Sequence, residues 1–126
     1  MVVYVDTNIF IYLLEDSGEL GLRVADMLDD FKSRNHSFVT STLTLTEFLA
    51  GSLTSETVFS SMPRLSFVPL EENIAIKAGQ MQRASGLKVG DAIHVATAEH
   101  AGASVFFTND QALAVRLPSD LQAMTL

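Results

Sequence analysis

The sequence predicts an α/β fold in which helices cover both faces of a largely parallel sheet. Two observations support this prediction. Short runs of β-branched and aromatic residues alternate along the chain with longer segments of helical periodicity, a pattern typical of parallel strands joined by right-handed crossover helices. The chain has 126 residues, 48% of them hydrophobic, which is enough to bury a single core. Because no repeat, linker or low-complexity tract divides it, we expect residues 1–126 to form one domain.

The first half of the chain is expected to contain two strands and four helices. A β-branched and aromatic run ends at Asp6, where Asp, Thr and Asn can cap the apolar helix that follows. A longer helix has apolar residues at spacings of three and four, such as Val24, Met27 and Leu28, and Gly51 is expected to cap a later helix. In chain order, the expected elements are strand 2–5, helix 9–14, helix 20–34, strand 38–40, helix 43–50 and helix 55–61.

The second half is expected to alternate between strands and helices in the same way. Pro69 ends a strand, and Glu72 then stands in the favourable first turn of a helix that Gly86 closes. Asp91 is expected to open the next helix and Gly102 to close it. In chain order, the expected elements are strand 65–68, helix 71–86, helix 91–100, strand 104–107, helix 111–116 and strand 121–126.

Charge and composition narrow the classes of function. Eight Lys and Arg against 15 Asp and Glu give a net charge of −7, the wrong sign for a protein that binds phosphates over a broad surface. This charge does not exclude a metal-bridged contact at one phosphate.

The lack of cysteine excludes disulfides, thiolate metal sites and thiol nucleophiles. The apolar runs are too short to cross a bilayer and the first residues lack signal-peptide features, so we expect a cytoplasmic protein without membrane contact.

Four acidic residues are candidates for a functional site: Asp6, Glu47, Asp91 and Asp110. Asp6 and Asp110 each follow a predicted strand, and parallel strands place such residues at the edge of the sheet where ligands bind. Each acid also has a structural explanation, because Asp favours helix starts and the segment from Thr44 to Glu47 matches a capping box. Helix capping explains each acid singly, but it explains less well why four acids would gather at one crevice.

These carboxylates are expected to hold a divalent metal ion. In a shared pocket they would repel one another unless cations neutralise them, and all-oxygen ligands favour Mg²⁺ or Mn²⁺, which promote phosphodiester hydrolysis. We expect Asp6, Asp91 and Asp110 to be metal ligands, while Glu47 either ligates the ion directly or holds a water molecule on it. Neighbouring polar residues are expected to orient these carboxylates, namely Thr7, Asn8, Thr108 and Asn109.

Four blocks of the sequence occur in a characteristic order and spacing. They are V-D-T-N-I at 5–9, T-E-F at 46–48, K-V-G-D-A-I-H-V-A-T-A at 88–98 and F-T-N-D at 107–110. Together they resemble the PIN-domain ribonucleases, in particular the VapC-like toxins of type II toxin–antitoxin systems. The resemblance covers the whole chain, and its specificity lies in the order of the blocks rather than in any one of them.

This resemblance implies a three-layer α/β/α sandwich and Mg²⁺- or Mn²⁺-dependent cleavage of RNA. It implies that Asp6, Glu47, Asp91 and Asp110 are the acidic quartet of such enzymes. It further implies a homodimeric toxin inhibited by a cognate antitoxin protein, and the negative charge of the chain fits an antitoxin with basic segments. One departure is Ala112, near which many relatives carry a further polar or acidic residue, and this weakens the case for a fifth ligand.

Other interpretations of single residues and of the whole chain compete with this one. His94 lies on nearly the same helix face as Asp91 and could touch substrate or a ligand carboxylate, although a packed or hydrogen-bonded structural histidine is the commoner case. Lys88 and Arg116 lie near the motifs and could meet phosphate, but solvation at the surface is their default role.

The residues also bear on alternative functions of the whole chain. An aspartyl-nucleophile phosphotransferase is disfavoured because Asn8 stands where its second Asp is expected. The alternative from another class is a non-catalytic PIN-like module that binds protein or RNA.

Overall fold

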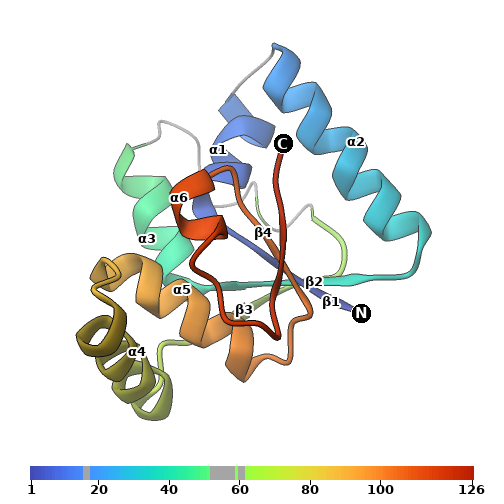
Figure 1. The fold of residues 1–126 in the computed structure, drawn as a ribbon. Coiled ribbons are helices and arrows are strands. Elements are labelled where there is room, and N and C mark those ends of the chain that lie inside the picture. The colour runs from blue at the N-terminus through green and yellow to red at the C-terminus, as the bar shows by residue number, and fades with distance from the viewer. Residues whose placement is uncertain (16–17, 52–58, 60–61) are drawn as a thin grey trace.

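The computed structural model describes residues 1–15, 18–51, 59 and 62–126, and these contain a five-stranded central sheet (Figure 1). The strand order is β3-β2-β1-β4-β5, and every pairing between neighbouring strands is parallel. The predicted α/β class with a mainly parallel sheet is confirmed. The strands are β1 (Val2–Val5), β2 (Ser37–Ser41), β3 (Leu65–Val68), β4 (Val105–Phe107) and β5 (Gln122–Met124).

Helices cover both faces of this sheet and complete a three-layer α/β/α sandwich. Figure 1 shows α1 and α2 on one side of the sheet and α4 and α5 on the other. Buried residues of α1, α2 and α3 belong to one hydrophobic core, and those of α4, α5 and α6 belong to a second. The helices are α1 (Thr7–Glu15), α2 (Glu19–Ser33), α3 (Thr42–Gly51), α4 (Glu72–Ser85), α5 (Val89–His100) and α6 (Gln111–Ala114).

The central strand β1 contributes to both cores. Successive side chains of a strand point to opposite faces, so Val3 and Val5 join the core under α1, α2 and α3, whereas Tyr4 joins the other core. There Tyr4 stacks on Phe106 of β4, with ring centroids 5.0 Å apart. This alternation places the hydroxyl of a fully buried tyrosine on the α5 side of the sheet, close to the site described below.

Two of the three glycines predicted to end helices have the expected conformation. Gly86 and Gly102 both have φ of 71°, in the left-handed region that glycine adopts at little cost. They follow α4 and α5, as predicted. The prediction for Gly51 is wrong, because this residue belongs to α3 as its last described residue and its φ is not positive.

Several element boundaries differ from the prediction. Helix α5 starts at Val89, two residues before the predicted start at Asp91. Helix α6 ends at Ala114 instead of extending to Arg116, since a helix is disfavoured just before Pro118. Strand β5 is shorter than the predicted 121–126. The helix predicted over 55–61 lies outside the described residues, apart from Phe59. None of the described helices is long and apolar enough to cross a membrane.

Candidate functional site

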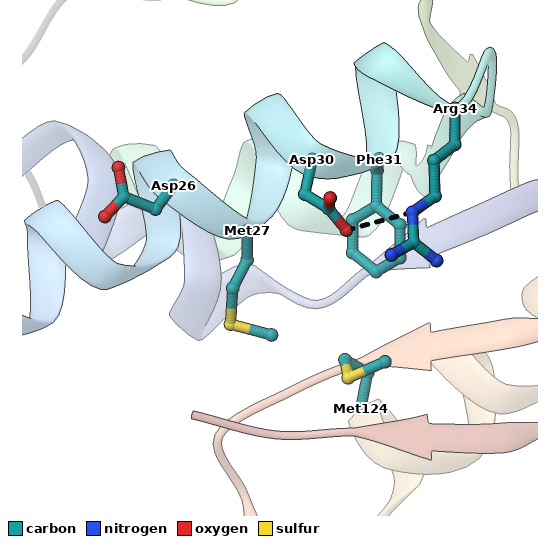
Figure 2. A pocket seen from close by; sticks show the side chains of 6 residues that line it. All are labelled: Asp26, Met27, Asp30, Phe31, Arg34 and Met124. Atoms are coloured by element: carbon teal, nitrogen blue, oxygen red, sulfur yellow. Dashed lines mark ion pairs between the residues drawn. The ribbon is translucent and has the colours of Figure 1, made fainter.

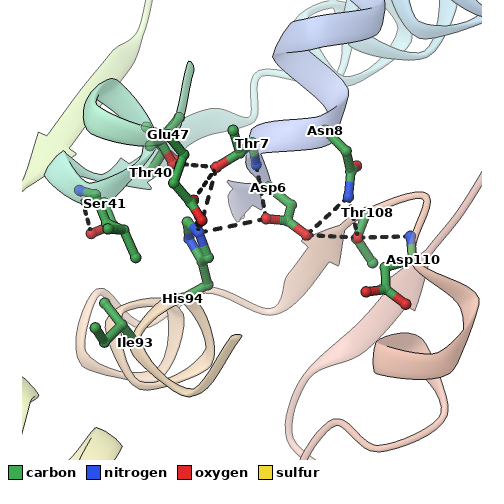
Figure 3. Close-up of polar contacts among 12 residues, drawn as sticks. Asp6, Thr7, Asn8, Thr40, Ser41, Glu47, Ile93, His94, Thr108 and Asp110 are labelled. Carbon is green, nitrogen blue, oxygen red and sulfur yellow. Dashed lines mark hydrogen bonds and ion pairs between the residues drawn. The ribbon is translucent and has the colours of Figure 1, made fainter. Parts of the chain in front are cut away.

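The predicted acids gather at the edge of the sheet where the strands end. Asp6 directly follows β1, and Asp110 comes shortly after the neighbouring strand β4. Glu47 comes from α3, which follows β2 on the other side of β1, and Asp91 comes from the first turn of α5. Figure 3 shows Asp6 at the centre of polar contacts that extend from Glu47 on one side to Asp110 on the other.

Both carboxylate oxygens of Asp6 are held by hydrogen bonds. Asp6 is only 5% exposed. Its Oδ1 accepts from the backbone N–H of Thr7 (2.8 Å), and its Oδ2 accepts from the hydroxyl of Thr108 (2.8 Å) and the side-chain amide of Asn8 (3.2 Å). Asn109 donates its backbone N–H to Asn8 Oδ1 (3.0 Å), so it supports Asn8 and not a carboxylate directly. Donors from the ends of two strands therefore set the orientation of Asp6.

The carboxylate of Glu47 is bound on one of its two oxygens. Oε1 accepts a hydrogen bond from the hydroxyl of Thr7 (2.7 Å) and another from His94 Nε2 (2.6 Å). The hydrogen bond from His94 is the main reason why the pKa of Glu47 lies below its ordinary value; the bond from Thr7 acts in the same direction and burial opposes both. Because the Glu47 side chain is 39% exposed, its other oxygen can still meet a ligand.

The start of α3 differs from the predicted capping box. Such a box would place Thr44 just before the helix, with Glu47 reaching back to its amide. Helix α3 instead begins at Thr42, and the hydroxyl of Ser41 accepts from the backbone N–H of Leu43 (3.0 Å). The capping-box interpretation of Glu47 is therefore wrong, and its carboxylate takes part in the site instead.

His94 connects the acids to a buried tyrosine. Its side chain is 2% exposed, with Nε2 lying 2.6 Å from Glu47 Oε1 and 3.8 Å from Asp6 Oδ1, and Nδ1 2.5 Å from the hydroxyl of Tyr4. Burial alone would lower the pKa of His94. The hydrogen bond to Glu47 and the charges of Asp6, Glu47 and Asp91 outweigh it and raise this pKa above its ordinary value. His94 is thus a packed, hydrogen-bonded residue that also contacts a candidate carboxylate.

The sequence interpretation missed a polar group beneath the site. The hydroxyl of Tyr4 accepts a hydrogen bond from the backbone N–H of Ser41 (3.1 Å), and the hydroxyls of Thr40 and Thr44 nearby lie 2.7 Å apart. Burial raises the pKa of Tyr4 well above its ordinary value, and the charge of Asp6 raises it further. The available signal was a tyrosine inside an otherwise apolar strand, because a buried tyrosine hydroxyl needs a hydrogen-bond partner.

Asp91 is half-buried and lies in the field of the other acids. Burial raises the pKa of Asp91, and the negative charges of Asp6 and Asp110 raise it further. The same turn of α5 lies against α3, since a Cβ atom built on Gly90 would be 3.6 Å from Glu47 Oε2. The structure therefore brings the four predicted acids into one neighbourhood.

Asp110 both caps a helix and faces a cavity. Its Oδ1 accepts from the backbone N–H of Leu113 (3.0 Å), and its own N–H donates to the hydroxyl of Thr108 (3.0 Å). The capping explanation offered for this residue is correct. Its Oδ2 accepts no hydrogen bond from the residues that the structure describes, so one oxygen stays available for a ligand.

The cavities among the described residues include a smaller one that is lined by two of the four acids, without Asp6 and Glu47, and a larger one elsewhere. The smaller cavity measures about 270 Å³, and Asp91 and Asp110 line it together with Lys88 and Arg116. The larger one, about 330 Å³, lies between α2 and Met124 of β5 (Figure 2) and has an Arg34–Asp30 ion pair in its wall. None of the four candidate acids lines the larger cavity. We therefore assign the candidate site to the smaller one.

The donor atoms of the site fit a hard divalent cation. Mg²⁺ and Mn²⁺ prefer oxygen ligands, which Asp6, Asp91 and Asp110 supply. The pKa of Asp91 is raised first by burial and then by the like charges of Asp6 and Asp110, which a cation would neutralise. Within the described ranges, no three His, Asp or Glu side chains form a ready-made metal-binding group. The fit thus rests on the donors and their charges rather than on preformed coordination.

Comparison with known protein families gives one match over most of the chain. The family model described as PIN domain matches residues 3–116, a range that includes Asp6, Glu47, Asp91 and Asp110. Among curated proteins, no sequence matches the chain.

Solved structures of similar fold include proteins from three bacteria. VapBC2 of Rickettsia felis bound to a promoter DNA fragment has a TM-score of 0.74 at 20% identity, covering 99% of this chain and 98% of that one. A toxin–antitoxin complex from Klebsiella pneumoniae has a TM-score of 0.72 at 20% identity, covering 94% of each chain. VapC20 of Mycobacterium tuberculosis, described as a sarcin–ricin loop cleaving toxin, has a TM-score of 0.73 at 12% identity, covering 95% and 98%.

Proposed function

The chain belongs to the PIN-domain family, and from this premise we propose that it is a metal-dependent endoribonuclease and the toxin of a toxin–antitoxin pair. The main support is the convergence of Asp6, Glu47, Asp91 and Asp110 at the carboxyl edge of a parallel sheet. Of the similar structures, one is a toxin described by its cleavage of the sarcin–ricin loop and the other two contain toxin–antitoxin pairs. The same class of activity is our proposal for this chain.

We assign the binding of Mg²⁺ or Mn²⁺ to Asp6, Asp91 and Asp110. A bound ion of this kind would polarise the scissile phosphate and lower the pKa of a water molecule. Asp6 is kept in one orientation by Thr7 and Thr108, which limits the rearrangement that binding requires. The oxygen of Asp110 that the helix cap leaves for this role is Oδ2, which accepts no hydrogen bond from the described part of the chain.

Glu47 has a separate role in this proposal. Thr7 and His94 both bind its Oε1, so the position of the whole carboxylate is set while Oε2 faces the first turn of α5. The lowered pKa of Glu47 keeps it ionised at neutral pH. An ionised, oriented carboxylate at this place can either ligate the cation or orient the attacking water.

We propose two protein partners, a cognate antitoxin and a second copy of the chain. The net charge of −7 favours an antitoxin that presents basic residues. Apolar side chains on the first three helices offer contact surface, since Ile11 is 40% exposed, Leu22 66% and Leu49 37%. Light scattering of the isolated chain tests the dimer: the mass of one chain at all concentrations would contradict it.

Cleavage of RNA by the purified chain tests the enzymatic proposal. We expect discrete fragments from total bacterial RNA in Mn²⁺, and none when EDTA is added. Asp6→Asn and Asp91→Asn should each abolish these fragments while circular dichroism and the melting temperature show a folded protein. Asp26→Asn is the matched control, because this exposed carboxylate on α2 lines the other cavity and should retain full activity.

The same experiment separates the enzyme from a non-catalytic binding module. Loss of cleavage in both site variants and retention in Asp26→Asn would support catalysis by the acids. Cleavage that persists in Asp91→Asn or in EDTA would point to a contaminating nuclease. A folded wild-type protein that cuts no RNA in Mn²⁺ but still binds RNA or an antitoxin would favour the binding module.

A further inference from the structure

The cavity beside the acids also contains two basic side chains. Lys88 and Arg116 line it together with Asp91 and Asp110. Its volume of about 270 Å³ lies just below the usual range for ligand sites, which favours a small group over a large one. The proposed metal site needs only the carboxylates, so the two basic residues are left without a role in it.

Basic residues are scarce in this chain, which makes their placement informative. There are eight Lys and Arg against 15 Asp and Glu. Three of the eight form ion pairs with carboxylates in the described ranges, namely Lys32, Arg34 and Lys77. Neither Lys88 nor Arg116 has a carboxylate within ion-pair distance among the described residues, although two carboxylates line the same cavity. Both cations therefore remain available to an external anion.

The backbone and one hydrogen bond place these two side chains at the cavity. Lys88 directly precedes α5, three positions before Asp91, and its positive charge lowers the pKa of Asp91 against the effects that raise it. Arg116 follows α6, and its guanidinium Nη2 donates to the backbone carbonyl of Ser85 at the end of α4. A guanidinium has five N–H donors, and hydrogen bonds within the described ranges use one of them, so others can meet phosphate oxygens.

From this arrangement we propose that Lys88 and Arg116 bind the RNA phosphate next to the one that is cut. This inference rests on the proposed function, since Asp91 and Asp110 define where the scissile phosphate lies. An RNA strand carries a negative charge on every nucleotide, so a strand held at the acids must place a further phosphate nearby. The positive charges of Lys88 and Arg116 attract that phosphate. The cation of the proposed site offsets the repulsion between this phosphate and the carboxylates.

The salt dependence of RNA binding tests this contact. The probe is a short, fluorescein-labelled single-stranded RNA of mixed sequence, titrated at increasing KCl with proteins that keep all four acids. Ca²⁺, which also binds oxygen ligands, replaces Mn²⁺, and a gel of each sample verifies that the probe stays intact. Each lost phosphate contact reduces the slope of log K against log salt by about 0.7 for single strands. We expect this reduction for Lys88→Gln and for Arg116→Gln, and about twice as much for the double variant.

Two controls isolate the local contact from charge and folding. Arg23→Gln removes the same charge from the exposed side of α2 and should leave the slope of the parent protein unchanged. Arg116→Lys keeps the charge and should restore most of the slope. Lys88→Gln breaks no hydrogen bond between described residues, so it tests the contact even if Arg116→Gln loosens the link to Ser85.

The outcomes distinguish this proposal from the proposed function. Unchanged slopes in both Gln variants, or no measurable binding of the probe, would overturn the phosphate contact. If the wild type then still cleaves RNA in Mn²⁺, the nuclease proposal stands without it. If the Gln variants have reduced slopes but the wild type cleaves no RNA, the phosphate contact stands as part of an RNA-binding site and the nuclease proposal fails.

Discussion

His94 Nε2 donates to Glu47 Oε1 at 2.6 Å, while His94 Nδ1 lies 2.5 Å from the hydroxyl of Tyr4. The imidazole of His94, which belongs to α5, thus connects a side chain of α3 with a buried side chain of β1. Glu47 and His94 are 47 residues apart in the chain, and Tyr4 and His94 are 90 apart. The orientation of a candidate catalytic carboxylate therefore depends on a residue in the core, beneath the proposed metal site.

Removing the Tyr4 hydroxyl should destabilise the protein. Tyr4→Phe leaves the ring in place but deprives the Ser41 N–H and His94 Nδ1 of a buried partner. Each unsatisfied buried polar group costs about 1–3 kcal/mol, so with two such groups we expect the free energy of unfolding in urea to fall by about 2–6 kcal/mol. Tyr12→Phe is the matched control, because the Tyr12 hydroxyl accepts one partly buried hydrogen bond, and a loss as large as that of Tyr4→Phe would contradict this account.

The Glu47–His94 contact should make stability depend on pH in two directions. The pKa of Glu47 is lowered in the folded state, so its contribution is present above the ordinary value of 4.5 and is lost as pH falls through the lowered value. The pKa of His94 is raised, so its contribution is present below the ordinary value of 6.5 and is lost as pH rises through the raised value. Both contributions are complete only between these two ordinary values.

Urea unfolding of the wild type and Glu47→Gln over this pH range measures that effect. Glu47→Gln removes the carboxylate that both shifts depend on. We expect the difference in unfolding free energy between the two proteins to be largest between pH 4.5 and 6.5 and to shrink on either side. A difference independent of pH would show that the contact is not an ionic one.

Asp91→Asn should stabilise the metal-free protein while it abolishes cleavage. Burial and the charges of Asp6 and Asp110 disfavour the ionised form of Asp91, so a neutral side chain of the same shape relieves repulsion. Asp91 is partly exposed and screened by solvent, so we expect a gain below about 1 kcal/mol in EDTA at neutral pH. Thermal unfolding measures it, with Asp26→Asn as the neutral control. A loss of stability in Asp91→Asn would mean that its carboxylate is a structural group.

Divalent metal should raise the melting temperature of the wild type. A ligand that binds only the folded state stabilises it by RT ln(1 + [L]/Kd), which is about 2.7 kcal/mol at one hundred times Kd. We expect Mn²⁺ to give such a shift in the wild type and a much smaller one in Asp6→Asn and Asp91→Asn, measured by differential scanning fluorimetry. Equal shifts in all three proteins would indicate binding elsewhere on this acidic chain.

Much of the fold could be predicted from local sequence patterns. The run at 2–5 and its stop at Asp6 depend on residues next to one another in the chain, and the same is true of the left-handed glycines Gly86 and Gly102. Short terminal elements were harder to predict. Helix α6 and strand β5 have four and three residues, too few for a periodic pattern to define their ends.

Only part of the candidate site could be predicted from the sequence. Asp6 and Asp110 could be placed at one edge of the sheet because parallel strands end on the same side. The sequence match from Thr44 to Glu47 was misleading, since a capping box needs only local spacing, whereas the carboxylate of Glu47 found stronger partners in Thr7 and His94.

The sequence by itself determined the order of strands and helices along the chain, because that order follows from local patterns. It also determined the edge at which Asp6 and Asp110 lie, because parallel strands end on the same side of a sheet. Only the tertiary structure decided which distant side chains meet: His94 with Glu47 and Tyr4, and Lys88 with Arg116 at one cavity. These long-range arrangements depend on how α3, α5 and α6 pack on the sheet. Packing of this kind is set by the shapes of buried side chains on several elements at once, and no single segment of sequence encodes it.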